Sequence, residues 1–530
     1  MFCEECGTKL EPGIRFCENC GTPVPMENIT TNPQNENTVK TENCISVFTS
    51  SNWQNLWKNE NSSCQNETGI ILTKSSNLCS QLSCSTEQLN QLIKNYAEDS
   101  RKRGVSYYFL DMDFNKVSHS ASGSVINVID TLSEICNICS PKYLFILGNE
   151  KVIDFQVWKN ESQDSDEDVS SDFGYTVLDV TSPWKGLKYT FDSALRVGRL
   201  PTWNGEQFEL FEIYFSKAKQ FIGQILSVKP YGLSALVWEN ESNHNYSSIA
   251  SNFVDVSPQV TQFNVDGRIP ADSNLFLFNL HGSDSTKFWY GQDGNDYPEA
   301  FSPENMSRLS SPNFIGVEAC YGAMYENGKT YATSNVLAAL SNNTIALLGS
   351  SRIAYGTSNP PGSCADIVIG EFIKQIAKGA TAGDAHIEGL KKITFGTMDD
   401  SDIKTLCEFA LYGDPSACTR TVYSVKSSTF TKSTMGLTSK TGIRNSRINI
   451  AIPDIRYQVH LSLAIVDKKI SEAINQHVWD KYPQMKGVEP KSYNVGNTRL
   501  LQSVYQNNKK QVVKIYYDSF GHIKKELSSK

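Results

Sequence analysis

Residues Asn313–Tyr325 read NFIGVEACYGAMY, an apolar run that stops at Cys320 and continues into small or flexible residues. A second run, 274–282 (NLFLFNLHG), stops in the same way at His281. Short apolar runs bounded by such residues are typical of buried strands in a parallel sheet. The two stretches therefore predict two strands, each ending in a side chain that can do chemistry.

The chain around these stretches alternates between expected strands and expected helices. Strands are expected at 105–112, 141–148, 233–241 and 344–351, and helices at 85–104, 124–139 and 364–379. Ser85 and Gln88 have the spacing of a capping box at the start of the first helix. Strands that alternate with helices indicate a parallel sheet with crossover helices, so the predicted fold class is α/β.

His281 and Cys320 are 39 residues apart, about the length of one crossover. If their strands are parallel neighbours, both side chains emerge at the carboxyl edge, where open α/β sheets bind ligands. A thiol and an imidazole at that edge can act as nucleophile and acid/base partner. Taken alone, Cys320 is better read as a core cysteine and His281 as an unrelated histidine, but the matching strand ends favour the dyad.

The order of motifs resembles the gingipain-type family of cysteine peptidases, which share the caspase-like fold, from Thr68 to Arg420. The motifs are PKYLFILGNEKVIDF (141–155), SDFGYTVLD (171–179), ALRVGRLP (194–201), NLHGSDSTKFWYG (279–291), ACYGA (319–323), ALLGSSRIAYG (346–356) and LYGDPSA (411–417). The resemblance implies a caspase-like, two-subdomain αβα sandwich with mostly parallel sheets. Its subdomains would cover 67–230 and 231–420.

The resemblance also implies roles for individual residues. Cys320 would attack the scissile carbonyl as a thiolate, and His281 would promote the attack and protonate the leaving amine. The backbone N–H groups of Gly282 and Cys320 would hold the oxyanion. Glu239, on the strand before the histidine strand, would orient the imidazole, although a surface glutamate at a strand end is nearly as good a reading.

Family members cut after Arg or Lys and place an acidic residue at the base of the pocket for that side chain. Glu241 matches one position for this acid, and the resemblance implies that Ser350, Ser351 and Tyr355 line the pocket. At a second position the sequence offers Gly356, where a tryptophan often stands, with no acid nearby. The preference for a basic residue is therefore left open.

The N-terminal segment 1–25 contains two Cys-x-x-Cys pairs, each followed by a glycine that permits a tight turn. The four cysteines are Cys3, Cys6, Cys17 and Cys20. Four soft ligands in two such pairs suit a tetrahedral structural Zn²⁺ site, and the segment resembles the zinc ribbons of many prokaryotic proteins. We expect it to have a structural role or to bind a protein partner. Residues 26–66, rich in Asn, Thr, Ser and Glu, read as a flexible linker.

The acidic segment 162–172 has the Asp-x-Asp-x-Asp start of a calcium loop at Asp164, Asp166 and Asp168. It lacks Gly at the sixth position and Glu at the twelfth. A solvated surface loop is therefore the preferred interpretation, with a Ca²⁺ site as the alternative.

Charge is distributed unevenly along the chain. Residues 421–530 carry 18 Lys and Arg against 7 Asp and Glu, about +11, whereas the whole chain is −8. This basic tail is expected to be an α+β module that lies against the acidic body and restrains activity until it is cut near Lys440–Arg447. An acidic body is a poor nucleic-acid binder, so we expect no nucleic-acid partner.

No apolar run is long enough to cross a membrane, and the N-terminus lacks a basic stretch followed by an apolar one. We therefore expect a cytoplasmic bacterial protein without a membrane partner. The expected function is that of a cysteine endopeptidase acting on protein or peptide substrates and regulated by its ribbon or its tail. The alternative is a non-enzymatic adaptor, in which a degenerate peptidase fold binds protein partners.

Overall fold

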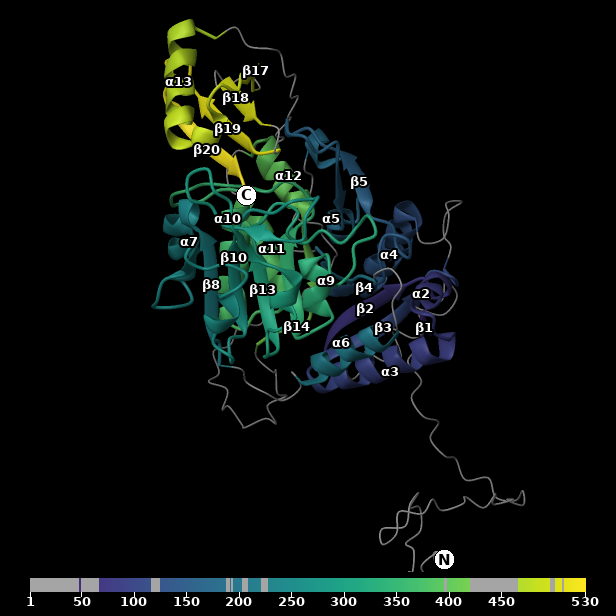
Figure 1. Cartoon of the computed structure of the whole chain (residues 1–530). Helices are drawn as coiled ribbons and strands as arrows, with labels where there is room; N and C mark the ends of the chain where they lie inside the picture. The colour runs from purple at the N-terminus through teal and green to yellow at the C-terminus, as the bar shows by residue number, and fades with distance from the viewer. Residues whose placement is uncertain are drawn as a thin grey trace, which may run out of the picture. The chain divides into compact units, whose positions relative to one another are not determined.

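The computed structural model describes residues 47–48, 66–115, 124–186, 191, 194–202, 208–220, 227–394, 398–419, 466–495, 501–507 and 510–530 (Figure 1). All of them belong to one compact unit, Ile45–Lys530. The four N-terminal cysteines and the segment Lys440–Arg447 lie outside the described residues. None of the helices within these ranges is long and apolar enough to span a membrane.

An 11-stranded sheet forms the body of the molecule. In spatial order its strands are β1 (Val47–Phe48), β3 (Val105–Asp111), β2 (Glu67–Thr73), β4 (Tyr143–Leu147), β7 (Arg196–Leu200), β16 (Phe409–Gly413), β14 (Thr344–Ser350), β13 (Asn313–Val317), β10 (Leu275–Asn279), β8 (Pro230–Ala235) and β9 (Asp255–Ser257). Neighbouring strands are parallel except β14 and β16. The predicted α/β class is confirmed, and the sheet runs without a break through the β7–β16 pair, across the two predicted subdomains.

Helices connect these strands and cover the sheet. They are α2 (Ser75–Leu82), α3 (Thr86–Lys102), α4 (Val125–Cys139), α5 (Phe173–Val177), α6 (Phe208–Gln220), α7 (Glu239–Tyr246), α8 (Pro303–Met306), α9 (Asn335–Leu340), α10 (Ala365–Ala377), α11 (Ala382–Ile393) and α12 (Asp400–Glu408). The capping box predicted at Ser85 and Gln88 is present. Two short antiparallel hairpins, β5 (Gln156–Lys159) with β6 (Asp168–Ser171) and β11 (Trp289–Tyr290) with β12 (Glu299–Phe301), complete the body.

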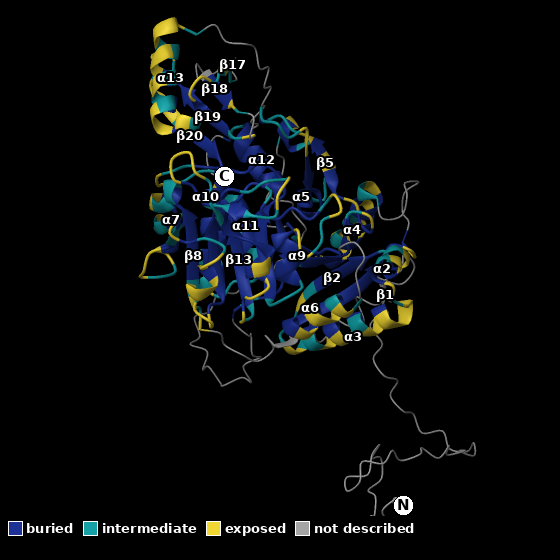
Figure 2. Ribbon diagram, in the orientation of Figure 1, coloured by how far each residue is buried: buried dark blue, intermediate teal, exposed yellow. Residues whose placement is uncertain are grey.

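The continuous apolar run of β10 follows from burial on both faces of the sheet. Phe276 and Phe278 pack into one hydrophobic cluster, whereas Leu275 and Leu277 pack into another that contains α10, α11 and α12. Figure 2 shows these central strands as uniformly buried, with exposed residues gathered on the outer faces of peripheral helices such as α3. Successive side chains of β10 therefore point to opposite faces of the sheet, each towards its own hydrophobic cluster.

One predicted strand is shorter than expected. The run 233–241 was expected to be extended throughout, but β8 ends at Ala235 and α7 begins at Glu239. The residues after Trp238 are polar and acidic, and carboxylates in a first helical turn are favoured by the exposed N–H groups there. Glu239 therefore opens a helix and does not lie on a strand.

The tail forms an antiparallel sheet with one helix, which agrees with the expected α+β module. The described elements are α13 (Lys468–Lys481), β17 (Lys491–Asn494), β18 (Leu501–Gln506), β19 (Val512–Tyr517) and β20 (Ile523–Ser529). A turn at Asp518–Gly521 joins β19 and β20. The sheet order β15-β20-β19-β18-β17 includes β15 (Tyr355–Gly356), so the tail's sheet pairs with a strand of the body. Figure 1 shows β20 at the side of the tail that faces the body.

One face of the tail's sheet packs on α13 and the other on the body. Ile474 and Val478 of α13 cover Val513 and Ile515 on the first face. On the second face Val512 and Leu527 join a buried cluster with Cys320, Ile353 and Tyr355 of the body. The candidate nucleophile therefore lies beneath the tail.

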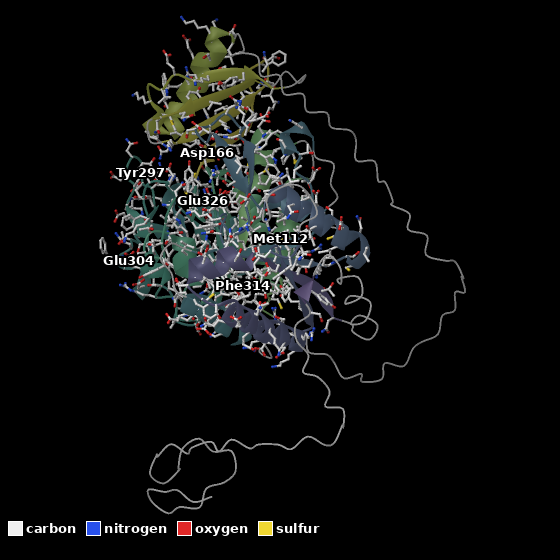
Figure 3. All side chains as sticks on the ribbon, turned by 90° about the vertical axis from the view of Figure 1, so that its right-hand side faces the viewer. Met112, Asp166, Tyr297, Glu304, Phe314 and Glu326 are labelled. Carbon is white, nitrogen blue, oxygen red and sulfur yellow. The ribbon has the colours of Figure 1, made fainter. Side chains whose placement is uncertain are left out.

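The acidic segment binds a lysine of the chain itself. The side chains of Asp164 and Asp166 are buried, and their carboxylates lie 2.7 and 2.6 Å from the ammonium of Lys404. Asp166 lies at the edge of the body nearest the tail (Figure 3). The surface-loop interpretation is wrong for these two side chains, and the Ca²⁺ alternative finds no support, because the ammonium of Lys404 already pairs with both carboxylates.

Candidate active site

Cys320 and His281 follow neighbouring parallel strands, as their sequence pattern predicts. Leu275 of β10 pairs with Phe314 of β13, and the pairing continues through Phe278 and Val317. The N–H of Glu318 extends the ladder by donating to the carbonyl of Phe278 (2.9 Å). Both strands therefore end at the same edge, and both side chains line one cavity of about 310 Å³.

A glycine permits the close approach of the two strand ends. A Cβ placed on Gly282 would lie 1.8 Å from the carbonyl oxygen of Cys320. No side chain can be accommodated at that separation, so the backbone beside His281 contacts the backbone of the cysteine directly. The resemblance assigns Gly282 an oxyanion-binding role, and the structure places its backbone beside Cys320.

The His281 ring is held from three sides. Its centroid lies 4.3 Å from that of Trp238 and 5.1 Å from that of Tyr297. Its Nε2 lies 2.7 Å from Oε1 of Gln292, whose amide group donates to the carbonyl of Gly294 (2.9 Å). Because the Gln292 oxygen faces the ring, Nε2 carries the proton and Nδ1 remains available as a base.

The buried environment keeps both reactive groups neutral. Burial lowers the pKa of His281 to about 4, although Gln292 opposes the shift. Burial also raises the pKa of the Cys320 thiol, whose Sγ lies 3.5 Å from the carbonyl oxygen of Ala354. In this closed arrangement the thiol retains its proton at neutral pH, and a neutral thiol is a weak nucleophile.

Three carboxylates form an acidic pocket beside the cavity. They belong to Glu241 in α7, Glu318 just before Cys320, and Asp366 in the first turn of α10, and they lie within 4.8 Å of one another. All three side chains are buried. We call this cluster the acidic pocket.

The ammonium of Lys530 occupies the acidic pocket. Its Nζ lies 2.8 Å from Oδ1 of Asp366 and 3.3 Å from Oε2 of Glu318, and it donates to Oδ1 of Asn279 (3.0 Å). The ammonium also lies 4.4 Å from the ring centroid of Trp238, a cation–π contact. Every face of the lysine head group therefore meets a complementary partner.

Burial and neighbouring charges together set the pKa values of these groups. Burial alone would lower the pKa of Lys530, but Asp366, Glu318 and Glu241 raise it above its usual value. Burial, followed by the charge of Asp366, raises the pKa of Glu241 to about 8 against the opposing effect of Lys530. The pocket thus favours a charged amine, and Glu241 retains its proton at neutral pH.

The other sequence-predicted residues lie apart from this arrangement. Among the described residues no hydrogen bond joins Glu239 to the His281 ring, whose partner is Gln292. The Ser350 hydroxyl donates to the carbonyl of Arg352 (2.9 Å), and the Ser351 hydroxyl donates to that of Ser170 (3.1 Å).

Tyr355 meets the tail through its backbone, which pairs with Ser529, while its hydroxyl donates to Asp164 (2.6 Å). Of the predicted substrate-binding residues, the structure therefore brings Glu241 and the Tyr355 backbone to the occupied pocket. It does not bring the two serine hydroxyls there.

Sequence reasoning missed Glu318, Asp366 and Gln292. Glu318 carried a usable signal, because it is a charged residue inside an otherwise apolar buried run. Asp366 did not, since an acid in a first helical turn is common for electrostatic reasons alone. Gln292 lies close to His281 because Tyr290, two residues before it, forms a β-bridge with His281. No local sequence pattern indicates this bridge.

A zinc-ribbon family model matches residues 2–24, which include all four N-terminal cysteines. No curated protein matches the sequence. Among solved structures, the chain is similar to the Arg-specific cysteine proteinase gingipain R, with 12% identity, 88% of this chain and 91% of that chain covered, and a TM-score of 0.49.

It is also similar to the complex of Porphyromonas gingivalis RgpB pro- and mature domains, with 14% identity, 67% and 80% coverage and a TM-score of 0.49. A further structure, described only as a protease, is 10% identical, with 87% and 90% coverage and a TM-score of 0.43. With each TM-score below 0.5, function has to be argued from the residues of this chain.

Proposed function

We propose that this protein is a cysteine endopeptidase that cleaves the peptide bond after a lysine or arginine residue. One observation carries the proposal: a thiol and an imidazole line a single cavity, beside a buried pocket of three carboxylates that already holds an ammonium group. A nucleophile, a base and a charge-selective pocket are the parts that such a reaction needs.

The proposed reaction gives one role to each of these groups. His281 takes the thiol proton at Nδ1, and the sulfur of Cys320 attacks the carbonyl carbon of the basic residue. The N–H of Cys320 points to the developing oxyanion, and the imidazolium gives its proton to the leaving amine. A thioester remains on Cys320, and water hydrolyses it to release the carboxylate product and the thiol.

The acidic pocket supports the proposed preference for a basic side chain. Buried carboxylates without a counter-charge lose hydration, so an apolar side chain would leave the ionised members of the pocket uncompensated. A lysine or arginine head group supplies both charge and donors. The preference for a basic residue, which the sequence leaves open, is therefore part of the proposal.

Hydrolysis of fluorogenic peptide amides tests the proposal. A peptide ending in lysine should be cleaved by the Lys530→Ala chain, whose pocket is empty, and the Cys320→Ala change should abolish this activity. A lysyl chloromethyl ketone should label Cys320, and the label should be lost in His281→Ala. Slow labelling that does not depend on His281, together with no hydrolysis, would instead support the adaptor function.

We also propose that Cys3, Cys6, Cys17 and Cys20 bind one structural Zn²⁺, on the basis of the zinc-ribbon match at residues 2–24. Purified protein should contain about one zinc ion per chain, as expected for a four-cysteine site. Cys3→Ser with Cys6→Ser should remove it without changing peptide hydrolysis. Metal content that is unaffected by these changes would contradict the assignment.

A further inference from the structure

Strand β20 adds to the body beside the nucleophile as an extended peptide would. It pairs antiparallel with β15, with Ser529 opposite Tyr355 and Ser528 opposite Gly356. The N–H of Lys530 continues the ladder by donating to the carbonyl of Ala354 (2.9 Å). Addition of a strand to a sheet edge is a common way for proteins to bind peptides, since the backbone supplies affinity and side-chain pockets supply specificity.

The backbone of Lys530 meets both proposed catalytic residues. Its carbonyl oxygen accepts a hydrogen bond from the N–H of Cys320 (3.3 Å). Its backbone also lies against the His281 ring, where it raises the pKa of the imidazole against the effect of burial. This is where the carbonyl of a residue about to be cleaved would lie. The N–H of Cys320 therefore already has the contact that oxyanion stabilisation requires.

The side chain of Lys530 completes the likeness to a bound substrate. It is fully buried in the acidic pocket, and its stem passes over Gly356, where a Cβ would lie 2.1 Å from Cε of the lysine. Glycine at 356 thus leaves open the passage that the lysine occupies. Backbone pairing, carbonyl position and head-group recognition all coincide in one residue.

Resting on the proposed function, we propose that β20 is a built-in substrate mimic, with Lys530 in the position of the residue before the cleaved bond, and that it holds the peptidase inactive. Residues 528–530 occupy the groove that a substrate needs, and Leu527 belongs to the same buried hydrophobic cluster as Cys320. A substrate binds only when β20 has been displaced from β15.

Other basic residues of the tail anchor this strand to the acidic body. Lys525, in β20, pairs with Asp399 (2.6 Å) and Asp402 (3.1 Å). Lys510, before β19, pairs with Asp284 (2.6 Å), three residues after His281. In these ion pairs the positive charge of the tail contacts the negative charge of the body.

Covalent linkage strengthens the block. An inhibitory strand on the same chain acts at an effective concentration on the order of millimolar, so even a weak product-like contact keeps the groove filled. Restraint therefore needs no tight binding by β20 itself, and a change in the tail's position is enough to release it.

The test compares single substitutions within the same strand. Lys530→Ala empties the acidic pocket, and Lys525→Ala removes an anchor. Lys524→Ala is the matched control, because its half-exposed ammonium pairs with Asp518 in the same hairpin. Lys530→Met, which keeps the length of the stem without its charge, provides a second variant should Lys530→Ala fold poorly.

Two readouts separate this inference from the proposed function. The first is kcat/KM for a lysyl peptide amide, and the second is the rate at which iodoacetamide alkylates Cys320, followed by peptide mapping. We expect Lys530→Ala to raise both by at least tenfold, Lys525→Ala to raise them less, and Lys524→Ala to leave them within twofold of the original chain.

Each result of this experiment leads to one conclusion. Equal hydrolysis and equal alkylation in all variants would overturn the inhibitory role while leaving a peptidase in place. Faster alkylation in Lys530→Ala without hydrolysis of any basic peptide would support occlusion of Cys320 by β20 and overturn the peptidase function. Faster rates in Lys524→Ala equal to those in Lys530→Ala would point to general loosening of the tail and overturn the role of Lys530.

Discussion

Replacing Asp366 by asparagine removes one negative charge from the acidic pocket and changes its shape little. Oδ2 of Asp366 accepts from the N–H groups of Thr357 (2.8 Å) and Ser363 (3.0 Å), while Oδ1 faces the ammonium of Lys530. The carbonyl oxygen of asparagine can keep the backbone contacts. The loss is therefore confined to the bond with the basic head group.

The size of the effect follows from the geometry. The carboxylate and the ammonium are 2.8 Å apart, and both side chains are fully buried. Hydrogen bonds to charged groups contribute about 1.5–3 kcal/mol. Since about 1.36 kcal/mol corresponds to a tenfold change in rate, the preference for lysine should fall by about 13- to 160-fold.

The assay compares peptide amides that carry lysine or norleucine before the cleaved bond, because norleucine keeps most of the stem and lacks the charge. The background is Lys530→Ala, so that weaker restraint by the tail does not offset weaker substrate binding. Glu371→Gln is the control, since this acid lies on the same helix but pairs with Lys374 and Lys392 at its far side. An unchanged lysine-to-norleucine ratio in Asp366→Asn would refute the assignment of the acidic pocket.

Three further changes test other parts of the site. Gly282→Ala should abolish hydrolysis and lower the melting temperature, because the added Cβ would collide with the carbonyl of Cys320; activity retained at a tenth or more of the original would contradict the close approach. Gln292→Leu removes the acceptor for Nε2–H of His281 and should lower kcat by about 2- to 13-fold with little change in KM, whereas a pure KM effect would exclude a positioning role. Burial raises the pKa of Glu241 to about 8, so this acid loses its proton as the pH rises through 8 and adds negative charge beside the ammonium. The lysine-to-norleucine ratio should therefore rise between pH 7 and 9, and a rise that persists in Glu241→Gln would assign it to another group.

The positions of Cys320 and His281 were predictable because strand pairing is a general consequence of an alternating βα sequence. Two apolar runs one crossover apart place their last residues at the same edge, whatever the details of packing. Glu241 was within reach of the same reasoning, through the resemblance. Glu239 was not correctly placed, since the length of β8 depends on where the polar residues after Trp238 begin a helix.

The acidic pocket and its occupant could not be read from the sequence for a different reason. Glu318 and Asp366 come from a strand end and a helix start 48 residues apart, and Lys530 comes from the end of the tail. Glu318 stands out as a charge inside an apolar run, but nothing in the sequence pairs it with Asp366 or Lys530. The net charges of tail and body predicted that they would meet, but charge totals do not say which lysine enters the site.

The same carboxylates bind the substrate's basic side chain and hold the inhibitory Lys530, so a change to these carboxylates affects both functions. Any change that weakens the hold of the acidic pocket on a substrate lysine also weakens its hold on Lys530, because the same atoms bind both head groups. A variant with poorer substrate binding can therefore be less inhibited, so its measured activity is the product of two opposing effects. Anchors outside the pocket, such as the pair of Lys525 with Asp399, affect inhibition by the tail but not substrate binding. Restraint can then be adjusted at the tail's docking surface without altering the residue that the site accepts.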